Sequence, residues 1–166
     1  MSDAPPPTRC GIGYDTHRLA EGLPLVLAGI ELPSSRGPVA HSDGDVLCHA
    51  ITDALLGAAA LGDIGRHFPD TDPQWRNTSS LRFLEMTRQM LAAAGYRILN
   101  VDNVVVLDEP RLAPFIGKIR ENIADSLGLN LNQISVKVKT SEGTAPELAA
   151  AHAVVLLASN SPTLPE

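Results

Sequence analysis

The hydrophobic and polar positions along the chain divide it into short segments with two different periods. Alternating or continuous apolar residues, rich in β-branched side chains and bounded by glycine or polar turns, predict strands. A turn at residues 21–22 would join the first two strands as a hairpin, and residues 34–38 are expected to form a loop. The predicted strands are residues 10–17, 23–32, 96–107, 134–138 and 152–158.

Apolar residues spaced three and four apart predict three helices in the remaining segments. The first lies within residues 41–65, with Ser42 or Asp43 as its N-cap and with Gly62 and Gly65 marking its end. The other two cover residues 80–94, capped by Ser79, and residues 113–127, ended by Gly128.

The order of these elements indicates the fold class. Two strands are followed by two helices, a strand, a helix and two strands, which favours an α+β single-domain sandwich with helices packed on one face of a mixed β-sheet. A chain of 166 residues suits one domain. We expect residues 9–158 to form this domain, residues 1–8 to be a disordered leader and residues 159–166 a disordered tail.

Charge and cysteine content limit the classes of function. The net charge is −6 and no cluster of Lys and Arg is present, which argues against binding of nucleic acid through a basic face. The two cysteines, Cys10 and Cys48, are too few for a disulfide-stapled secreted domain and favour a reduced, cytoplasmic setting. The start of the chain lacks the apolar region of a signal peptide, and no apolar run is long enough to cross a membrane.

Asp15 and His17 are candidate metal ligands at the end of the first strand. Side chains two residues apart in a strand point to the same face, and His49 in the first helix could add a second imidazole. Two imidazoles and one carboxylate with an open position are typical of a catalytic zinc site. Taken alone, the Asp-x-His pattern is better explained by a surface pair and a core histidine. Asp53, four residues after His49, is a candidate fourth ligand or outer partner.

The segment HSDGD, residues 41–45, concentrates polar side chains at a predicted helix N-terminus. Such an end can bind phosphate through its free N–H groups. Of Asp43 and Asp45, one could cap the helix while the other orients a metal-bound histidine. A well-capped helix without further function explains the segment equally well.

Two further polar segments could contact a ligand. Asp63, Asp70 and Asp72 suit hydrogen bonds to a polyol, although an ordinary solvated acidic loop is the alternative. In KTSEG, residues 139–143, the hydroxyls and the ammonium group could hold phosphate, and Glu142 could bind Mg²⁺. On its own this second segment is better explained as a polar turn.

Together, these segments resemble one family. GYDTHRL at 13–19, the block AHSDGDVLCHAITDALLGAAALGDIG at 40–65 and FPDTDP at 68–73 resemble the 2-C-methyl-D-erythritol 2,4-cyclodiphosphate synthases, and weaker similarity extends from residue 10 to 158. The resemblance implies a phosphorus–oxygen lyase of non-mevalonate isoprenoid biosynthesis. In its reaction the 2-phosphate of 4-diphosphocytidyl-2-C-methyl-D-erythritol 2-phosphate attacks the β-phosphorus and CMP leaves. The family forms homotrimers with sites between subunits.

The resemblance also implies a role for each matching residue. Zn²⁺ would be held by Asp15, His17 and His49, and a second cation, Mg²⁺ or Mn²⁺, by Glu142 with the diphosphate. His41 and Thr140 would stabilise the transition state. The methylerythritol and its phosphates would be bound by Ser42, Asp63, Ile64, Gly65, Phe68, Asp70, Asp72, Lys139 and Ser141, and the cytidine by Leu107, Asp108, Glu109, Pro110, Arg111, Leu112 and Ala113.

The chain departs from the family pattern after Glu142. The family continues with a segment like KLGFTGRGEG, whereas this chain has the shorter GTAPELAAAH and lacks the aromatic and the arginine of that segment. The family usually has Thr where Lys139 stands. Our hypothesis is that Lys139 supplies the positive charge of the missing arginine.

Two other functions compete with this interpretation. A zinc-dependent phosphate-ester hydrolase would use metal-bound water and release inorganic phosphate rather than CMP. A non-enzymatic trimeric binding protein on the same scaffold would bind nucleotide without turnover. An intact set of three ligands argues against the second alternative, because a pure binder does not need an open metal position.

Overall fold

The computed structural model describes residues 8–160 of the chain. The predictions of disorder at residues 1–7 and 161–166 lie outside the described residues. The strands are β1 (Thr8–Glu21), β2 (Leu25–Leu27), β3 (Ile30–Leu32), β4 (Arg36–Pro38), β5 (Tyr96–Val106), β6 (Ile134–Lys139) and β7 (Leu148–Ser159). The α-helices are α1 (Val46–Ala58), α2 (Ile64–His67), α3 (Ser80–Ala93) and α4 (Ile116–Leu127), and the 3-10 helices are η1 (Pro73–Trp75), η2 (Ala113–Phe115) and η3 (Leu131–Gln133).

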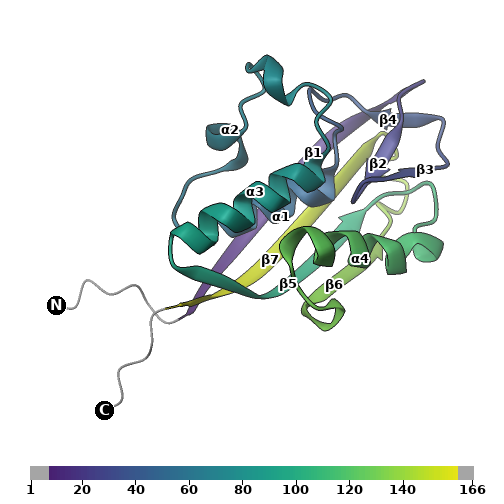
Figure 1. Cartoon of the computed structure of the whole chain (residues 1–166). Coiled ribbons are helices and arrows are strands. Elements are labelled where there is room, and N and C mark those ends of the chain that lie inside the picture. Colours follow the sequence, from purple (N-terminus) through teal and green to yellow (C-terminus); the bar gives the residue numbers. More distant parts are fainter. Residues whose placement is uncertain (1–7, 161–166) are drawn as a thin grey trace, which may run out of the picture.

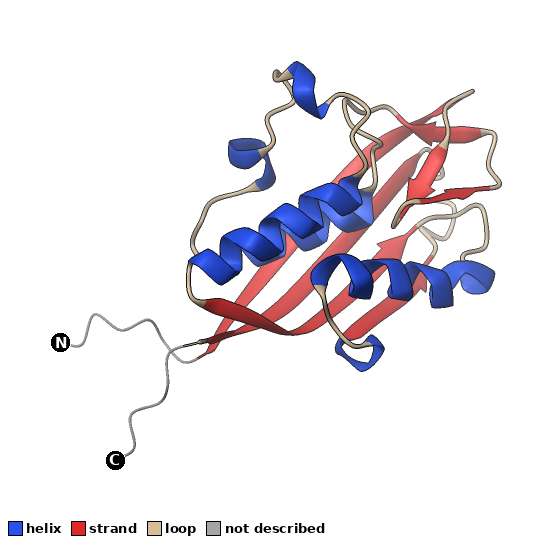
Figure 2. Ribbon diagram, in the orientation of Figure 1, coloured by secondary structure: helices blue, strands red, loops and turns tan. Residues whose placement is uncertain are grey.

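A five-stranded sheet in the order β4-β1-β7-β5-β6 organises the molecule. Neighbouring strands are antiparallel except for β5 and β6, which are parallel. The helices α1, α3 and α4 pack together on one face of this sheet (Figures 1 and 2). The predicted α+β fold, a mixed sheet with helices on one face, is therefore confirmed.

The pairing of the first strand differs from the prediction. β1 runs on to Glu21 and pairs along most of its length with β7, and its last residues pair with β4, which the sequence analysis assigned to a loop. The predicted hairpin between residues 10–17 and 23–32 is wrong. The second segment instead folds on itself as β2 and β3 around Ala28 and Gly29, which both have positive φ, at 47° and 71°. A two-residue turn of this kind matches the twist of a hairpin, so the bend falls there rather than at residues 21–22.

The ends of three elements, α1, β7 and β1, also differ from the prediction. Asp45, and neither Ser42 nor Asp43, is the N-cap of α1, since its side chain accepts the Cys48 N–H. The helix ends at Ala58, before Gly62. β7 begins at Leu148, because pairing with Arg18 and its neighbours keeps the alanines at 149–151 extended despite their helix propensity. Thr8 and Ser159, which the prediction placed in leader and tail, belong to β1 and β7.

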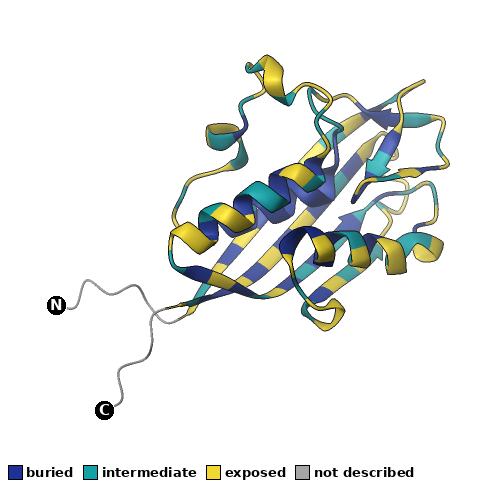
Figure 3. Ribbon diagram, in the orientation of Figure 1, coloured by how far each residue is buried: buried dark blue, intermediate teal, exposed yellow. Residues whose placement is uncertain are grey.

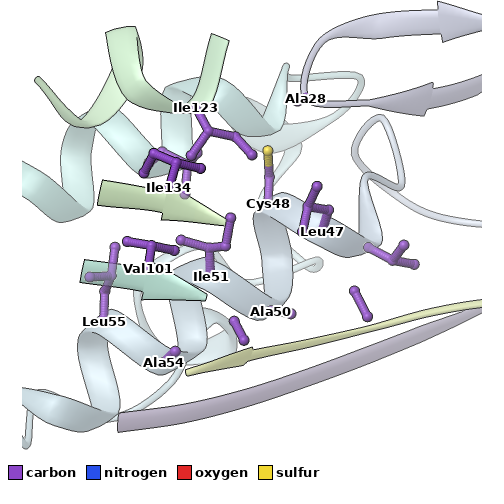
Figure 4. Close-up of a cluster of buried hydrophobic side chains, with 14 of the residues drawn as sticks. Ala28, Leu47, Cys48, Ala50, Ile51, Ala54, Leu55, Val101, Ile123 and Ile134 are labelled. Carbon is purple, nitrogen blue, oxygen red and sulfur yellow. The ribbon is translucent and has the colours of Figure 1, made fainter. Parts of the chain in front are cut away.

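The core lies between the sheet and the helices, with α1 at its centre. Figure 3 shows the strands alternating between buried and exposed residues, as expected of a sheet covered on one side only. Small residues of α1, Ala50 and Ala54, lie nearest the strands β1 and β7, whereas Ile51 and Leu55 project toward the rest of the core (Figure 4). The small side chains let this helix lie very close to the sheet.

The opposite face of the sheet carries exposed apolar side chains. Ile12 is 74% exposed and is paired in register with Val154, which is 44% exposed, and Tyr14 is 53% exposed beside His152. The Tyr14 and His152 rings lie 4.7 Å apart. Contiguous exposed apolar residues usually mark a contact surface. In the described part of the chain, no helix is both long and apolar enough to span a membrane.

Candidate metal centre

Asp15 and His17 lie near the end of β1 and face α1. They alternate with the exposed Tyr14 and Thr16, so both side chains project from the helix-covered face. Gly13 brings the helix close at this point, because a Cβ on it would lie 1.9 Å from the Ala50 carbonyl oxygen. His49 precedes Ala50 in α1 and is thereby held against the strand.

The three predicted ligands converge. The Asp15 Oδ2 atom lies 2.9 Å from His49 Nδ1 and 3.1 Å from His17 Nε2, and these two nitrogens are 3.3 Å apart. One ligand atom from each residue lies within 4.8 Å of the others, so the cluster could hold a metal ion. Two imidazole nitrogens and one carboxylate oxygen suit zinc and other divalent transition metals. The convergence predicted from the sequence is confirmed.

The electrostatics keep the carboxylate charged. Burial acts to raise the pKa of Asp15, but hydrogen bonds from His17 and His49 outweigh it and hold that pKa well below its usual range. Burial acts to lower the pKa of His49, and the hydrogen bond and charge of Asp15 raise it overall. A half-buried carboxylate whose charged form is stabilised by two neighbouring imidazoles fits a cation site.

Asp53 takes a different role from the ligand considered in the sequence analysis. Its Oδ1 accepts the backbone N–H of Ile64 at 2.7 Å, which ties α1 to the start of α2. It is not part of the three-residue cluster. It instead fixes the segment that carries Ile64 and Gly65.

A pocket of about 580 Å³ opens above the cluster. Six further residues with predicted roles line it: His41, Ser42, Ile64, Gly65, Phe68 and Asp70. Asp63 and Asp72 are not among the lining residues of this pocket and cap short helices, since Asp63 accepts the Arg66 N–H and Asp72 the Gln74 N–H, and their predicted contacts with substrate stay predictions. The His41 Nε2 lies 3.3 Å from the Asp72 carbonyl oxygen, so the backbone at Asp72 still borders the His41 side chain.

One wall of this pocket is aromatic, which the sequence patterns did not predict. Phe83 stacks on Phe68 with ring centroids 4.6 Å apart, and Trp75 meets both rings edge-on. The available signal was the position of the only tryptophan in an aromatic-poor chain, two residues after the end of FPDTDP. The contact of Trp75 with Phe83 in α3 could not be inferred from residue spacing, because the loop and the helix come together only in the folded chain.

The residues with predicted cytidine roles line a second pocket, of about 370 Å³, which shares no lining residue with the first. It contains Leu107, Asp108, Pro110–Ala113 and Thr140. Asp108 accepts hydrogen bonds from the Ser141 N–H and hydroxyl, which lower the pKa of Asp108 and join the loops after β5 and β6. Glu109 borders a neighbouring hollow with Pro110 and Arg111.

The remaining predicted residues lie at the end of β6. Lys139 is exposed there, and Glu142 has φ 54° and accepts a hydrogen bond from Thr140 Oγ1 at 3.0 Å. β7 and β5 separate β6 from β1 in the sheet. A single chain therefore brings Asp15, His17 and His49 together in one pocket and places Thr140 in another.

Asp45, the cap of α1, yields a prediction about pH. Burial, with the charge of Asp43, raises its pKa to about 6 from 3.8, despite hydrogen bonds from Cys48, and its Oδ2 has no partner. The folded state therefore binds a proton more tightly than the unfolded chain. The stability this contributes is complete below pH 3.8 and is lost as the pH rises through about 6.

The Asp45→Asn variant keeps a capping oxygen and removes the charge. Urea unfolding of chelator-treated protein should give equal stabilities near pH 4 and a variant more stable by ~2–3 kcal/mol above pH 7. A difference between the two proteins that does not change with pH would contradict this assignment.

The fold and the site define a class of protein, an α+β domain with a candidate metal centre where a strand meets a helix. A sequence model of the YgbB family matches residues 8–158, and the chain belongs to this family. A Gloeobacter violaceus protein named 2-C-methyl-D-erythritol 2,4-cyclodiphosphate synthase is 54% identical over 153 residues, covering 90% of this chain and 94% of that protein.

Other relatives carry the same name. A Syntrophomonas wolfei protein is 54% identical over 153 residues, covering 90% of this chain and 98% of its own length. A solved structure of 2C-methyl-D-erythritol-2,4-cyclodiphosphate synthase in a form bound to CDP superposes with a TM-score of 0.86 at 47% identity, over 90% of this chain and 99% of that one. The predicted family is thus confirmed.

Proposed function

We propose that this chain converts 4-diphosphocytidyl-2-C-methyl-D-erythritol 2-phosphate to 2-C-methyl-D-erythritol 2,4-cyclodiphosphate with release of CMP, as a phosphorus–oxygen lyase. The observation that carries the proposal is the convergence of Asp15, His17 and His49 at a pocket in a chain whose relatives bear this enzyme's name. The CDP-bound relative supports a cytidine-linked substrate.

The first pocket provides what an intramolecular phosphoryl transfer needs. The nucleophile is the substrate's own 2-phosphate, so the protein has only to position the reacting groups and neutralise charge. A divalent cation held by Asp15, His17 and His49 would supply Lewis-acid polarisation of a β-phosphate oxygen. His41 and Ser42 line the same pocket and would contact the phosphates, and the segment from Ile64 to Asp70 would enclose the methylerythritol.

The second pocket is suited to the nucleotide. Leu112, Ile116 and Val138 provide an apolar surface, and backbone groups of the loop from Leu107 to Ala113 would bind the cytidine. Thr140 would contact the phosphates, Lys139 and Ser141 would add donors, and Glu142 would bind a second cation, Mg²⁺ or Mn²⁺, with the diphosphate. No group in this pocket has to react covalently.

A homotrimer would unite the two pockets into sites between subunits. The separation of the pockets in one chain and the exposed apolar face around Ile12, Tyr14 and Val154 both support this assembly. An interface of this kind would cover side chains that water now reaches. Cys10 and Cys48 are free thiols, which supports a protein that functions in the reducing environment of the cytoplasm.

Phosphorus NMR tests the proposed reaction. The purified full chain, incubated with the diphosphocytidyl substrate, Zn²⁺ and Mg²⁺, should give equal amounts of CMP and a cyclic diphosphate. Release of inorganic phosphate would support a hydrolase instead. Tight binding of CDP with no product would favour a binding protein.

A further inference from the structure

We propose that Ser80, itself held by Asp43, fixes the orientation and protonation of the His49 ring so that Nδ1 faces the metal centre. This inference rests on the metal centre of the proposed function. It makes Ser80 and Asp43 positioning residues, which do not touch substrate or cation. Neither residue was assigned by the family resemblance.

The two nitrogens of the His49 ring face different groups. Nδ1 lies 2.9 Å from Asp15 Oδ2 and 3.3 Å from His17 Nε2, on the side of the metal centre. Nε2 lies 2.9 Å from the Ser80 hydroxyl oxygen. A neutral imidazole carries one proton, so a ring that ligates through Nδ1 must carry its proton on Nε2 and needs an acceptor there.

Asp43 makes the Ser80 hydroxyl into that acceptor. A carboxylate can only accept, and Asp43 Oδ1 is in hydrogen-bond contact with Ser80 Oγ, so the hydroxyl proton of Ser80 points to Asp43. The lone pairs of Ser80 Oγ are then free to accept the Nε2–H of His49. Asp43 Oδ2 also accepts the backbone N–H of Ser80 at 2.8 Å, which fixes the position of the serine.

Burial strengthens this arrangement. Ser80 is fully buried and His49 is 8% exposed, so water is not available to replace the hydroxyl. Ser42 Oγ lies farther from His49 Nε2, at 3.2 Å, and its side chain borders the pocket, where it is available to a ligand. Ser80 is therefore the better-placed permanent partner of Nε2.

The same contacts link the metal centre to the packing of two helices. Ser80 is the first residue of α3, and the N-cap Ser79 makes no side-chain capping bond. Asp43, from the loop before α1, takes over that task and thereby joins the start of α3 to the loop. The position of α3 is in this way coupled to the orientation of a ligand in α1.

Cobalt affinity tests the proposal without the enzymatic reaction. Ser80→Ala should raise the Kd for Co²⁺, read from its visible absorption, by about 10–100-fold, the usual cost of losing a partner that orients a metal-bound histidine. Ser80→Thr, which keeps the hydroxyl, should recover most of the affinity. The matched control is Ser126→Ala, which removes another buried serine hydroxyl, one that donates to Asn122 in α4, and it should leave the Kd unchanged.

Nitrogen-detected NMR of the histidine rings gives a readout that does not depend on a folded Ser80→Ala variant. In the Zn²⁺-loaded wild-type chain, His49 should carry a proton on Nε2 that exchanges slowly with water. Fast exchange there, or an unchanged Co²⁺ Kd in folded Ser80→Ala, would overturn the inference and leave the metal centre standing. A wild-type chain that binds no Co²⁺ would overturn both the inference and the metal centre.

Discussion

The His49→Ala variant is expected to bind no divalent cation and to lose at least ~10³-fold of the proposed CMP-forming rate, because a cation held by this cluster would supply several kcal/mol of charge stabilisation to the transition state. His49 contributes one of the three ligand atoms, and the two that remain come from a single strand. Metal content by atomic emission and CMP release by phosphorus NMR should fall together. The control His67→Gln changes a histidine that contacts the Leu61 carbonyl oxygen outside the cluster, and it should retain both.

Mixing two inactive variants shows whether His49→Ala is inactive because it lacks a metal ligand or because it does not fold. If sites form between subunits, mixed trimers of His49→Ala and Thr140→Ala contain some interfaces with both halves intact. Random assembly of equal amounts should restore about a quarter of the wild-type sites, although each variant alone is nearly inactive. Full activity in metal-free His49→Ala would refute the ligand assignment, and mixed trimers without recovery would place both halves of each site in one chain.

The metal cluster could be predicted because its ligands obey local rules. Asp15 and His17 share a face through the two-residue period of a strand, and the periodicity around His49 identified its helix. The approach of that helix to the strand is the nonlocal part of the prediction, and it came from the family resemblance rather than from periodicity. Gly11 and Gly13 explain it physically, since each places a carbonyl oxygen of α1 within 2.0 Å of where a Cβ would stand.

Strand pairing and the Ser80 contact behind the cluster could not be predicted in the same way, although Asp43 was a candidate for orienting a metal-bound histidine. β1 pairs with β7, which lies near the other end of the chain, and no local sequence pattern identifies β7 as the partner of β1. Without that information, residues 21–22 looked like the turn of a hairpin between neighbouring segments. Ser80 contacts His49 from a helix more than thirty positions away. In the sequence, Ser80 looks like any residue at the start of a helix. Only its contact with Asp43 in the folded chain distinguishes Ser80 from the neighbouring Ser79.

The Gly13→Ala variant should therefore lose both stability and metal. Its Cβ would lie 1.9 Å from the Ala50 carbonyl oxygen and 2.7 Å from the Ala54 backbone nitrogen, and backbone atoms cannot move aside as a flexible side chain can. Relieving the overlap requires α1 to shift away from β1, at a cost of about 3 kcal/mol or more. The same shift would carry His49 away from Asp15 and His17, which lie two and four residues beyond Gly13.

A matched glycine isolates the effect of the close approach. Gly117 lies in α4, and a Cβ on it meets nothing within 4 Å, so Gly117→Ala should be neutral or stabilise the helix by up to ~1 kcal/mol. Urea unfolding and Co²⁺ titration of both variants should show a large loss of stability and affinity at position 13 alone. Wild-type stability with weakened Co²⁺ binding in Gly13→Ala would indicate that the helix shifts without strain. Unchanged values in both would mean that helix and strand are not in contact at Gly13, and the geometric basis of the metal centre would be wrong.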